Sequence, residues 1–248
     1  MTKTKVFLPT TQIRNGRAII TGDDVHHLRL VLRKQVNDQL LVAVDGQTYC
    51  GIIRQLDSNQ IVVELGAKLS ECAESPVFVR LYQGMPKGDK LDLIIQKTVE
   101  LGVNEIVPFF SKHTVVKLTE QKQNRKLIRW QRIALEAAKQ CKRDEIPQVK
   151  MPLNFSEVVK KLEKCSDEHL VIMPYENALE FGLKQLESIK PKQISIIVGP
   201  EGGFSADEVE AISALGGKII HLGKRILRTE TAAIAVITLV QFLWGDLG

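Results

Sequence analysis

Hydrophobic and polar residues alternate over short runs in the first part of the chain, up to about residue 72. Polar turns separate these runs, and the runs themselves are rich in β-branched side chains, which predicts strands. Residues 23–34 begin with two aspartates and end with Arg and Lys, as a short helix does. We expect residues 1–72 to form a small β-barrel with one helix, and residues 70–76 to be a linker. The runs that predict strands are residues 39–45, 48–56 and 60–69.

Residues 73–248 show a different pattern, in which apolar runs alternate with segments of helical period. This alternation predicts an α/β domain with a parallel sheet and helices on both faces. Ligands of such sheets bind beyond the carboxyl ends of the strands, which singles out the loops at 174–176, 199–204 and 223–231. The predicted strands are residues 77–83, 106–110, 170–173, 194–198 and 219–222, and the predicted helices between them include 89–101 and 205–215.

The composition limits the class of protein. Of the 248 residues, 44% are hydrophobic and 25% are charged, which excludes disordered and collagen-like chains. The four cysteines form no C-x-x-C pair, and His26 and His27 have no partner that would complete a ligand set, so we expect no metal. The most apolar segment, 232–243, is shorter than the roughly 20 residues that span a bilayer. The N-terminus lacks the apolar run of a signal peptide, so we expect a cytoplasmic protein without a membrane partner.

The loop at 199–204, with the sequence GPEGGF, follows an apolar strand and precedes a capped helix. Its glycines let backbone N–H groups approach a ligand closely, and the helix N-terminus behind them favours negative charge. A tight turn without a ligand would select the same residues. The loop matches neither G-x-G-x-x-G nor the P-loop, so a dinucleotide or ATP site is not indicated.

The loop at 222–231 carries three cations between two apolar segments. Thr229 or Thr231 fits the cap of the next helix, and Glu230 fits its first turn. Helix capping does not explain the cations Lys224, Arg225 and Arg228, because positive charge near a helix N-terminus opposes the helix dipole. A local rule that is broken without compensation points to function.

These two motifs, GPEGGF at 199–204 and LGKRILRTET at 222–231, resemble those of the RsmE family of 16S rRNA methyltransferases in the SPOUT superfamily. Residues 84–90, QKTVELG at 96–102 and WGDLG at 244–248 extend the resemblance over nearly the whole chain. It implies a PUA-like, RNA-binding β-barrel at 1–72 and a SPOUT α/β domain with a deep trefoil knot at 73–248. It also implies S-adenosylmethionine (SAM) as cofactor, an obligate homodimer, and methylation of a uridine N3 in 16S rRNA, with the 30S ribosomal subunit as the expected substrate.

By position in the family motifs, the resemblance places the cofactor in three loops. Backbone groups would read the adenine edge, and Leu222, Ile226 and Leu227 would give it an apolar bed. In the loop at 173–178 the resemblance supports backbone contacts only. The residues assigned to SAM are Met173, Gly199, Pro200, Glu201, Gly202, Leu222, Gly223, Ile226, Leu227, Arg228 and Thr229.

Methyl transfer to a uridine N3 requires that negative charge on the uracil oxygens be stabilised and that the N3 proton be removed. Arg228 is the first candidate for the residue that stabilises the negative charge on the uracil oxygens. Glu230 or Glu201 is the candidate base, although Glu230 would also serve as a helix-capping residue. Because N3 lies on the Watson–Crick edge, the target must be unpaired or extruded from its stack.

Residues 112–143 contain ten Lys or Arg and only two acidic residues. Apolar residues at helical spacing predict a long amphipathic helix here, with Trp130 in the core. A solvated face without a partner usually mixes both signs, so this stripe favours contact with phosphates. The barrel has a second basic cluster near His26 and His27. The residues predicted to bind RNA are Arg17, Arg29, Arg33, Lys122, Arg125, Lys126, Arg129 and Arg132.

The last predicted helix, 231–243, is apolar nearly all round and is therefore buried in the core or between subunits. The resemblance favours burial between the subunits of a homodimer.

Two other functions stay open: a SPOUT methyltransferase for another RNA nucleoside, and a non-catalytic RNA-binding factor in ribosome assembly. A non-catalytic RNA-binding factor would explain the basic clusters, but it would not explain the motifs at 199–204 and 222–231, which follow two predicted strands.

Overall fold

The computed structural model describes residues 4–69, 73–116, 118–164, 166, 168–178 and 181–248. Residues 70–72 of the predicted linker lie outside this description. The chain divides into two compact units, an N-terminal unit of Met1–Glu74 with Ala138–Glu145, and a C-terminal unit of Ser75–Ala137 with Ile146–Gly248. The local pattern does not show that residues 138–145 return to the N-terminal unit, because their contacts there come from residues far away in the sequence.

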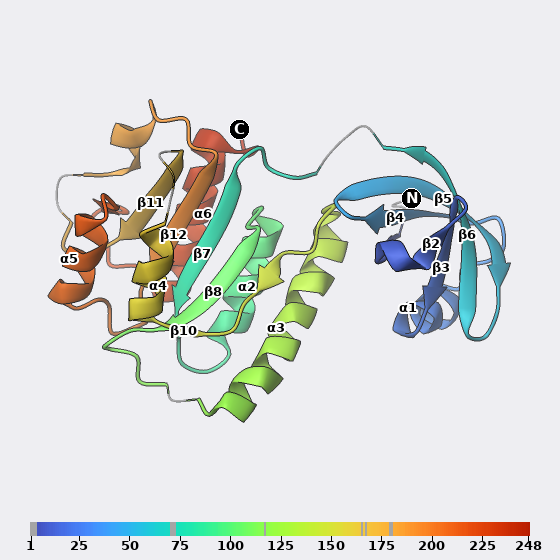
Figure 1. The fold of residues 1–248 in the computed structure, drawn as a ribbon, viewed down its shortest axis with the longest axis horizontal. Coiled ribbons are helices and arrows are strands. Elements are labelled where there is room, and N and C mark those ends of the chain that lie inside the picture. The colour runs from blue at the N-terminus through green and yellow to red at the C-terminus, as the bar shows by residue number, and fades with distance from the viewer. Residues whose placement is uncertain (1–3, 70–72, 117, 165, 167, 179–180) are drawn as a thin grey trace. The chain divides into compact units, whose positions relative to one another are not determined.

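The N-terminal unit is a curled six-stranded sheet in the order β1-β4-β5-β6-β3-β2 (Figure 1). Neighbouring strands are antiparallel except β1 and β4, which are parallel. The three strands predicted from alternation are confirmed as β4, β5 and β6. The strands are β1 (Lys5–Phe7), β2 (Ile13–Arg14), β3 (Arg17–Thr21), β4 (Gln39–Val44), β5 (Gln47–Leu56) and β6 (Gln60–Lys68), and a 3-10 turn, η1, covers Thr10–Gln12.

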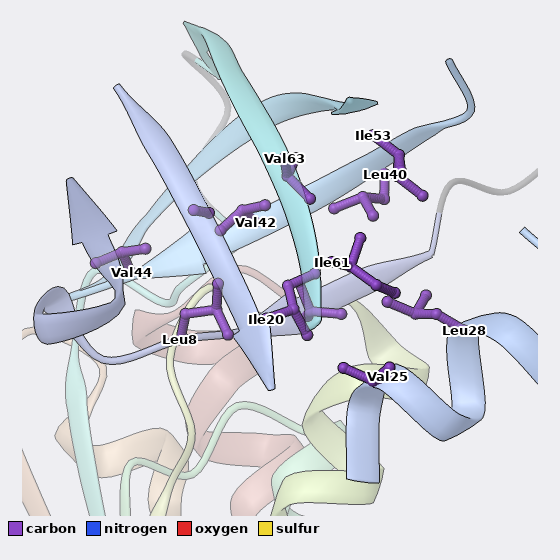
Figure 2. Packing of buried hydrophobic residues seen from close by; sticks show 12 residues of the cluster. Leu8, Ile20, Val25, Leu28, Leu40, Val42, Val44, Ile53, Ile61 and Val63 are labelled. Atoms are coloured by element: carbon purple, nitrogen blue, oxygen red, sulfur yellow. The ribbon is translucent and has the colours of Figure 1, made fainter. Parts of the chain in front are cut away.

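The predicted helix at 23–34 is shorter in the structure. Helix α1 (Asp23–His26) continues as a π-helical turn, η2 (His27–Val31), and Arg33 then adopts a positive φ of 51° that ends the helical path. Val25 and Leu28 point from this segment toward the strands and close the core of the unit (Figure 2). Burial of these apolar side chains is the main force that holds the helix on the sheet. The core residues that Figure 2 labels are Leu8, Ile20, Val25, Leu28, Leu40, Val42, Val44, Ile53, Ile61 and Val63.

The C-terminal unit is built on a parallel sheet in the order β10-β8-β7-β12-β11-β13, with β9 paired to β8. All strand pairs in the described part of this sheet are parallel, so the predicted α/β class is confirmed. The strands are β7 (Phe78–Gly84), β8 (Glu105–Phe110), β9 (Gln148–Val149), β10 (Leu153–Asn154), β11 (His169–Pro174), β12 (Gln193–Val198) and β13 (Lys218–Ile220). The helices are α2 (Lys90–Glu100), α3 (Glu120–Cys141), α4 (Phe155–Leu162), α5 (Ala206–Ala214) and α6 (Thr229–Trp244), with a 3-10 turn, η3, at Leu183–Leu186.

Helices cover both faces of this sheet (Figure 1). On one face Tyr82 and Ile197 pack in a cluster with Val158 of α4 and Ile212 of α5. On the other face α6 contacts β12 and α2. Because both faces are covered, β12 is apolar at nearly every position, and only its first residue is exposed. The sequence pattern did not predict α4, which a capping box at Asn154 and Glu157 begins.

Candidate functional site

The carboxyl ends of the neighbouring strands β11, β12 and β13 surround one pocket. Each strand contributes the loop that follows it, and these are the three loops that the sequence singled out. The structure therefore brings together segments that lie far apart in the chain, at the edge where parallel sheets bind their ligands. The lining residues are Pro174, Tyr175, Glu176, Val198, Gly199, Gly203, Phe204, Leu222, Gly223, Lys224, Arg225, Ile226, Leu227, Thr229 and Ala232.

Glycines in these loops keep backbone groups exposed to the pocket. A Cβ atom at Gly199 would lie 3.0 Å from the ring of Phe204, so even alanine is crowded there. Gly203 has a φ of +66°, and a Cβ atom there would lie 2.8 Å from a carboxylate oxygen of Glu176. Only glycine combines this conformation with the close approach. The loops thus present N–H and C=O groups to a ligand over a short distance.

The pocket has an apolar bed and a charged margin. Leu222, Leu227 and the 86% exposed Ile226 provide aliphatic surface. Glu176 is the one acid among the described lining residues, and Lys224 and Arg225 are the basic ones. None of these three charged side chains has an ion-pair partner within the described part of the chain. A ligand with a flat apolar ring and charges of both signs fits this arrangement.

Thr229 connects two of the loops. Its buried hydroxyl donates a 2.6 Å hydrogen bond to the carbonyl oxygen of Gly199 and accepts one of 2.9 Å from Gln83 Nε2. The prediction that Thr229 or Thr231 caps α6 is therefore wrong, since the N-cap residue is Arg228 and its side chain makes no capping hydrogen bond. The Thr229 hydroxyl serves tertiary contacts instead, which a local pattern does not reveal.

Glu201 and Glu230 lie on either side of Lys90. The Lys90 Nζ atom is 2.9 Å from Glu201 Oε1 and 3.6 Å from Glu230 Oε2. The hydrogen bond to Glu201 raises the pKa of Lys90. Burial raises the pKa of Glu201, but hydrogen bonds from Lys90 and the backbone outweigh it and hold that pKa below its usual value. The Glu201 carboxylate therefore already accepts hydrogen bonds from Lys90 and from the backbone of Lys87. In contrast, Glu230 Oε2 is buried without a hydrogen bond among the described atoms.

Arg228 is exposed and has no ion-pair or hydrogen-bond partner for its side chain in the described residues. Its guanidinium therefore stands free next to the first turn of α6. An unpaired cation at this helix end is unfavourable for the isolated helix. The acid in the first turn, Glu230, lies 3.6 Å from Lys90 and, within the described residues, makes no ion pair with Arg228, so the functional role that the sequence argument gives Arg228 stays a prediction.

The predicted cofactor residues fall into two sets. Gly199, Leu222, Gly223, Ile226, Leu227 and Thr229 line the pocket. Met173 is fully buried in the core. Four further residues assigned to SAM do not line the pocket: Pro200, Glu201, Gly202 and Arg228. The loop at 174–176, which the sequence left without side-chain roles, contributes Tyr175 and Glu176 to the lining. The sequence indicated Tyr175 and Glu176 only through the position of their loop, which follows the predicted strand at 170–173.

The predicted basic stripe lies on α3, and the structure divides its members. Arg129 is 2.5 Å from Asp92 of α2, and Lys126 lies 5.7 Å from the ring centre of Trp130, which is buried as expected. The other three cations are exposed and have no ionic partner in the described part of the protein: Lys122, Arg125 and Arg132.

In the N-terminal unit Arg17 lies on a different element from Arg29 and Arg33. Arg17 begins β3, and the helical segment with the other two arginines follows the opposite end of that strand. Five residues of strand span roughly 13 Å, at about 3.3 Å per residue. Arg17 instead faces Arg14 across the β2–β3 hairpin. The predicted cluster of His26, His27, Arg29, Arg33 and Lys34 stays in one segment, and Arg17 lies on a different element.

Among the described helices, none combines the length and the apolar character needed to cross a membrane. Within the same residues there is no group of three or more His, Cys, Asp or Glu side chains arranged to hold a metal ion.

A covered parallel sheet with a glycine-rich pocket at its carboxyl edge, together with a curled β-unit, defines a two-part α/β protein. Two family models give its class as RNA methyltransferase: an RNA methyltransferase domain matches residues 73–241, and an RNA methyltransferase PUA domain matches residues 20–66.

The chain belongs to the ribosomal RNA small subunit methyltransferase E family, which is the RsmE family that its motifs resemble. It is 34% identical to the Bacillus subtilis protein of that name, over 90% of this chain and 89% of the relative. A crystal structure of the Neisseria gonorrhoeae protein of that name, bound to S-adenosyl methionine, matches with a TM-score of 0.85 and 29% identity over 100% of both chains. A putative methyltransferase from Legionella pneumophila, solved with SAM, matches with a TM-score of 0.86 and 28% identity, again over 100% of both chains.

Proposed function

We propose that this protein transfers a methyl group from SAM to N3 of a uridine in 16S rRNA, with the 30S ribosomal subunit as substrate. The observation that carries the proposal is the pocket formed by the two family motifs and the loop at 174–176. Membership in a family whose relatives are named as small-subunit rRNA methyltransferases supports the class of substrate. A cytoplasmic location and the knotted path of the chain belong to the same proposal.

The residues of the pocket fit SAM. Aliphatic surface from Leu222, Ile226 and Leu227 suits its adenine ring, and the glycine backbone suits the polar edge of that ring. Glu176 would supply negative charge for the positive groups of the cofactor, and Lys224 or Arg225 would supply positive charge for its carboxylate, since all three line the pocket. When bound, SAM supplies a methyl group on a positively charged sulfur, which is already a strong electrophile.

Arg228 and Glu230 are the residues that we propose for the reaction. The free guanidinium of Arg228 would stabilise negative charge on the uracil oxygens as the N3 proton leaves. Glu230 would accept that proton on its carboxylate, because its Oε2 atom has no hydrogen bond among the described atoms, whereas Glu201 accepts hydrogen bonds from Lys90 and from the backbone N–H of Lys87. A flipped or unpaired uridine is required, since N3 is otherwise paired.

The direct test measures methylation. Incubation of the protein with SAM and 30S subunits that lack the modification is expected to give one N3-methyluridine in 16S rRNA, detected by mass spectrometry of nuclease digests. A different methylated nucleoside would favour another SPOUT-type specificity. If calorimetry detects no SAM binding, the non-catalytic RNA-binding function replaces this proposal.

The unpaired cations of α3 are expected to supply phosphate contacts. The triple variant Lys122→Gln, Arg125→Gln, Arg132→Gln should lower the slope of log K against log salt for RNA binding by about two to three, because each lost contact removes about 0.7–0.9. The affinity for SAM should not change. Replacement of Lys160 and Lys161 on α4 by Gln is the matched control. An unchanged salt slope in the triple variant would mean that this face of α3 does not contact RNA.

We also propose a homodimer that forms through α6. One side of this helix is buried, but Leu239 and Phe242 remain 42% and 63% exposed in the single chain. Large exposed apolar side chains on an otherwise buried helix are typical of a subunit interface. Sedimentation velocity is expected to show a dimer for the wild type and a monomer for Phe242→Asp. A monomeric wild type at micromolar concentration would contradict this proposal.

A further inference from the structure

The segment 83–90, which joins β7 to α2, does not line the pocket. It nevertheless contacts both family motifs, the loop at 199–204 and the loop at 222–231 with the first turn of α6. Three different kinds of contact make this connection: a buried hydrogen-bond chain, a close backbone approach and a pair of ionic contacts.

The hydrogen-bond chain begins at Gln83, which is fully buried. Its Nε2 atom donates to Thr229 Oγ1, and this hydroxyl donates in turn to the carbonyl oxygen of Gly199. A hydroxyl has a single proton to donate. Because Thr229 accepts from Gln83, its own proton is directed to Gly199, and the two motifs are fixed to each other through β7.

The close approach occurs at Gly84. A Cβ atom at this position would overlap the backbone nitrogen of Pro200 and lie 2.8 Å from the carbonyl carbon of Gly199. Backbone atoms cannot move aside as the end of a flexible side chain does. The end of β7 and the start of the loop at 199–204 are therefore in direct contact.

The ionic contacts involve Lys90 at the start of α2. Its ammonium group bonds Glu201, the charged residue of the first motif, and is within ion-pair distance of Glu230, the acid of the second. The backbone N–H of Lys87 donates to both carboxylate oxygens of Glu201, at 3.1 and 3.3 Å. One cation thus bridges the two motifs.

These ionic contacts are poorly placed to stabilise the fold as a whole. The Lys90 side chain is 35% exposed and that of Glu201 is 28% exposed. Partly exposed ion pairs contribute little to global stability because solvent screens them. Their contacts are local and join two loops that line the pocket.

We propose that Lys90 is a positioning residue for the cofactor: it holds the loops at 199–204 and 222–231 at the separation that binds SAM, without touching SAM. The inference rests on the proposed use of SAM by this pocket. Hydrogen bonding to Glu201 raises the pKa of Lys90, so the ammonium group stays charged at neutral pH.

The test compares three single variants by calorimetric titration with SAM. Lys90→Met is expected to weaken SAM binding about tenfold, in the usual range for coupling between sites. Lys90→Arg, which keeps the charge, should recover most of the affinity. Lys160→Met on α4 is the matched control, because Lys160 is exposed and has no ionic partner in the described residues. The thermal unfolding midpoint of all three variants should stay close to that of the wild type.

A double-mutant cycle separates positioning from general damage. If Lys90 acts through Glu201, then Lys90→Met should have little further effect on SAM affinity in a Glu201→Gln background. Wild-type affinity in Lys90→Met, or additive losses in the cycle, would overturn the inference. A wild-type protein that binds no SAM would instead refute the proposed function itself.

Discussion

Replacement of Arg228 by Ala is expected to lower the turnover number for RNA methylation about 10²–10³-fold, while the SAM dissociation constant changes little. The expected size is that measured when one preorganised donor to a developing negative charge is removed. Arg228 has the required features, since its guanidinium is exposed, unpaired within the described residues and next to the pocket-lining residues Leu227 and Thr229.

Protein stability should not explain that loss. The Arg228 side chain makes no capping hydrogen bond, and its charge opposes the dipole of α6, so the variant is expected to fold at least as well as the wild type. Arg228→Lys should retain part of the turnover because it keeps the charge. Turnover is measured with saturating SAM and 30S subunits. Wild-type turnover in Arg228→Ala would remove Arg228 from the reaction.

Replacement of Lys5 by Met is expected to reduce the free energy of unfolding of the N-terminal unit by about 3–5 kcal/mol, the usual cost of breaking a buried ion pair. The side chains of Lys5 and Asp144 are only 4% and 5% exposed, with Nζ 2.7 Å from Oδ1. Lys5 also donates to the carbonyl oxygens of Lys142 and Arg143, both at 2.9 Å. Without Lys5, Asp144 would be a buried charge without its cation.

The matched control is Arg54→Met. The Arg54–Glu64 pair belongs to the same unit but is 46% and 48% exposed, so its loss should cost less than about 1 kcal/mol. Hydrogen exchange of the β4 and β5 amides reports the opening of this unit in each variant. Equal effects of the two substitutions would show that the buried pair contributes no more than a surface pair.

The same pair predicts a dependence of stability on pH. Burial raises the pKa of Asp144, but hydrogen bonds from Lys5, Thr48 and the Ala73 backbone outweigh it, and the net pKa is lowered. The resulting contribution to stability is fully present above the unfolded-state pKa of about 3.9 and is lost as the pH falls through the lowered pKa. In Lys5→Met the main hydrogen bond that lowers the pKa is gone, so the folded-state pKa lies closer to the unfolded value or above it, and the stability lost on acidification should be smaller than in the wild type. Urea unfolding between about pH 3 and pH 7 measures this difference.

The sequence predicted most of the strands and the edge of the sheet where the pocket lies. Apolar runs of strand length and helical periods depend on burial of one or both faces, and these patterns are local. They placed β4–β6 and β7, β8, β11, β12 and β13 correctly within a few residues. They also identified the motifs at 199–204 and 222–231, because Gly and unpaired cations break local rules there.

Tertiary structure decided which residues serve the pocket and which serve the fold. Glu201 and Thr229 belong to conspicuous motifs, yet Glu201 is bound by Lys90, and Thr229 is bound by Gln83 and Gly199. Arg129 belongs to the predicted stripe but pairs with Asp92, which lies on α2. The partners of Thr229 lie 30 and 146 residues away along the chain, which is beyond the reach of any local pattern.

The sequence by itself thus determined the two-part architecture, the parallel sheet and the loops at its carboxyl edge, because these follow from hydrophobic period and from backbone rules that act over a few residues. Only the tertiary structure showed that Glu176 joins the pocket and that residues 83–90 contact both motifs. The physical reason is that hydrogen bonds and ion pairs depend on distance in space. The order of residues along the chain does not set that distance.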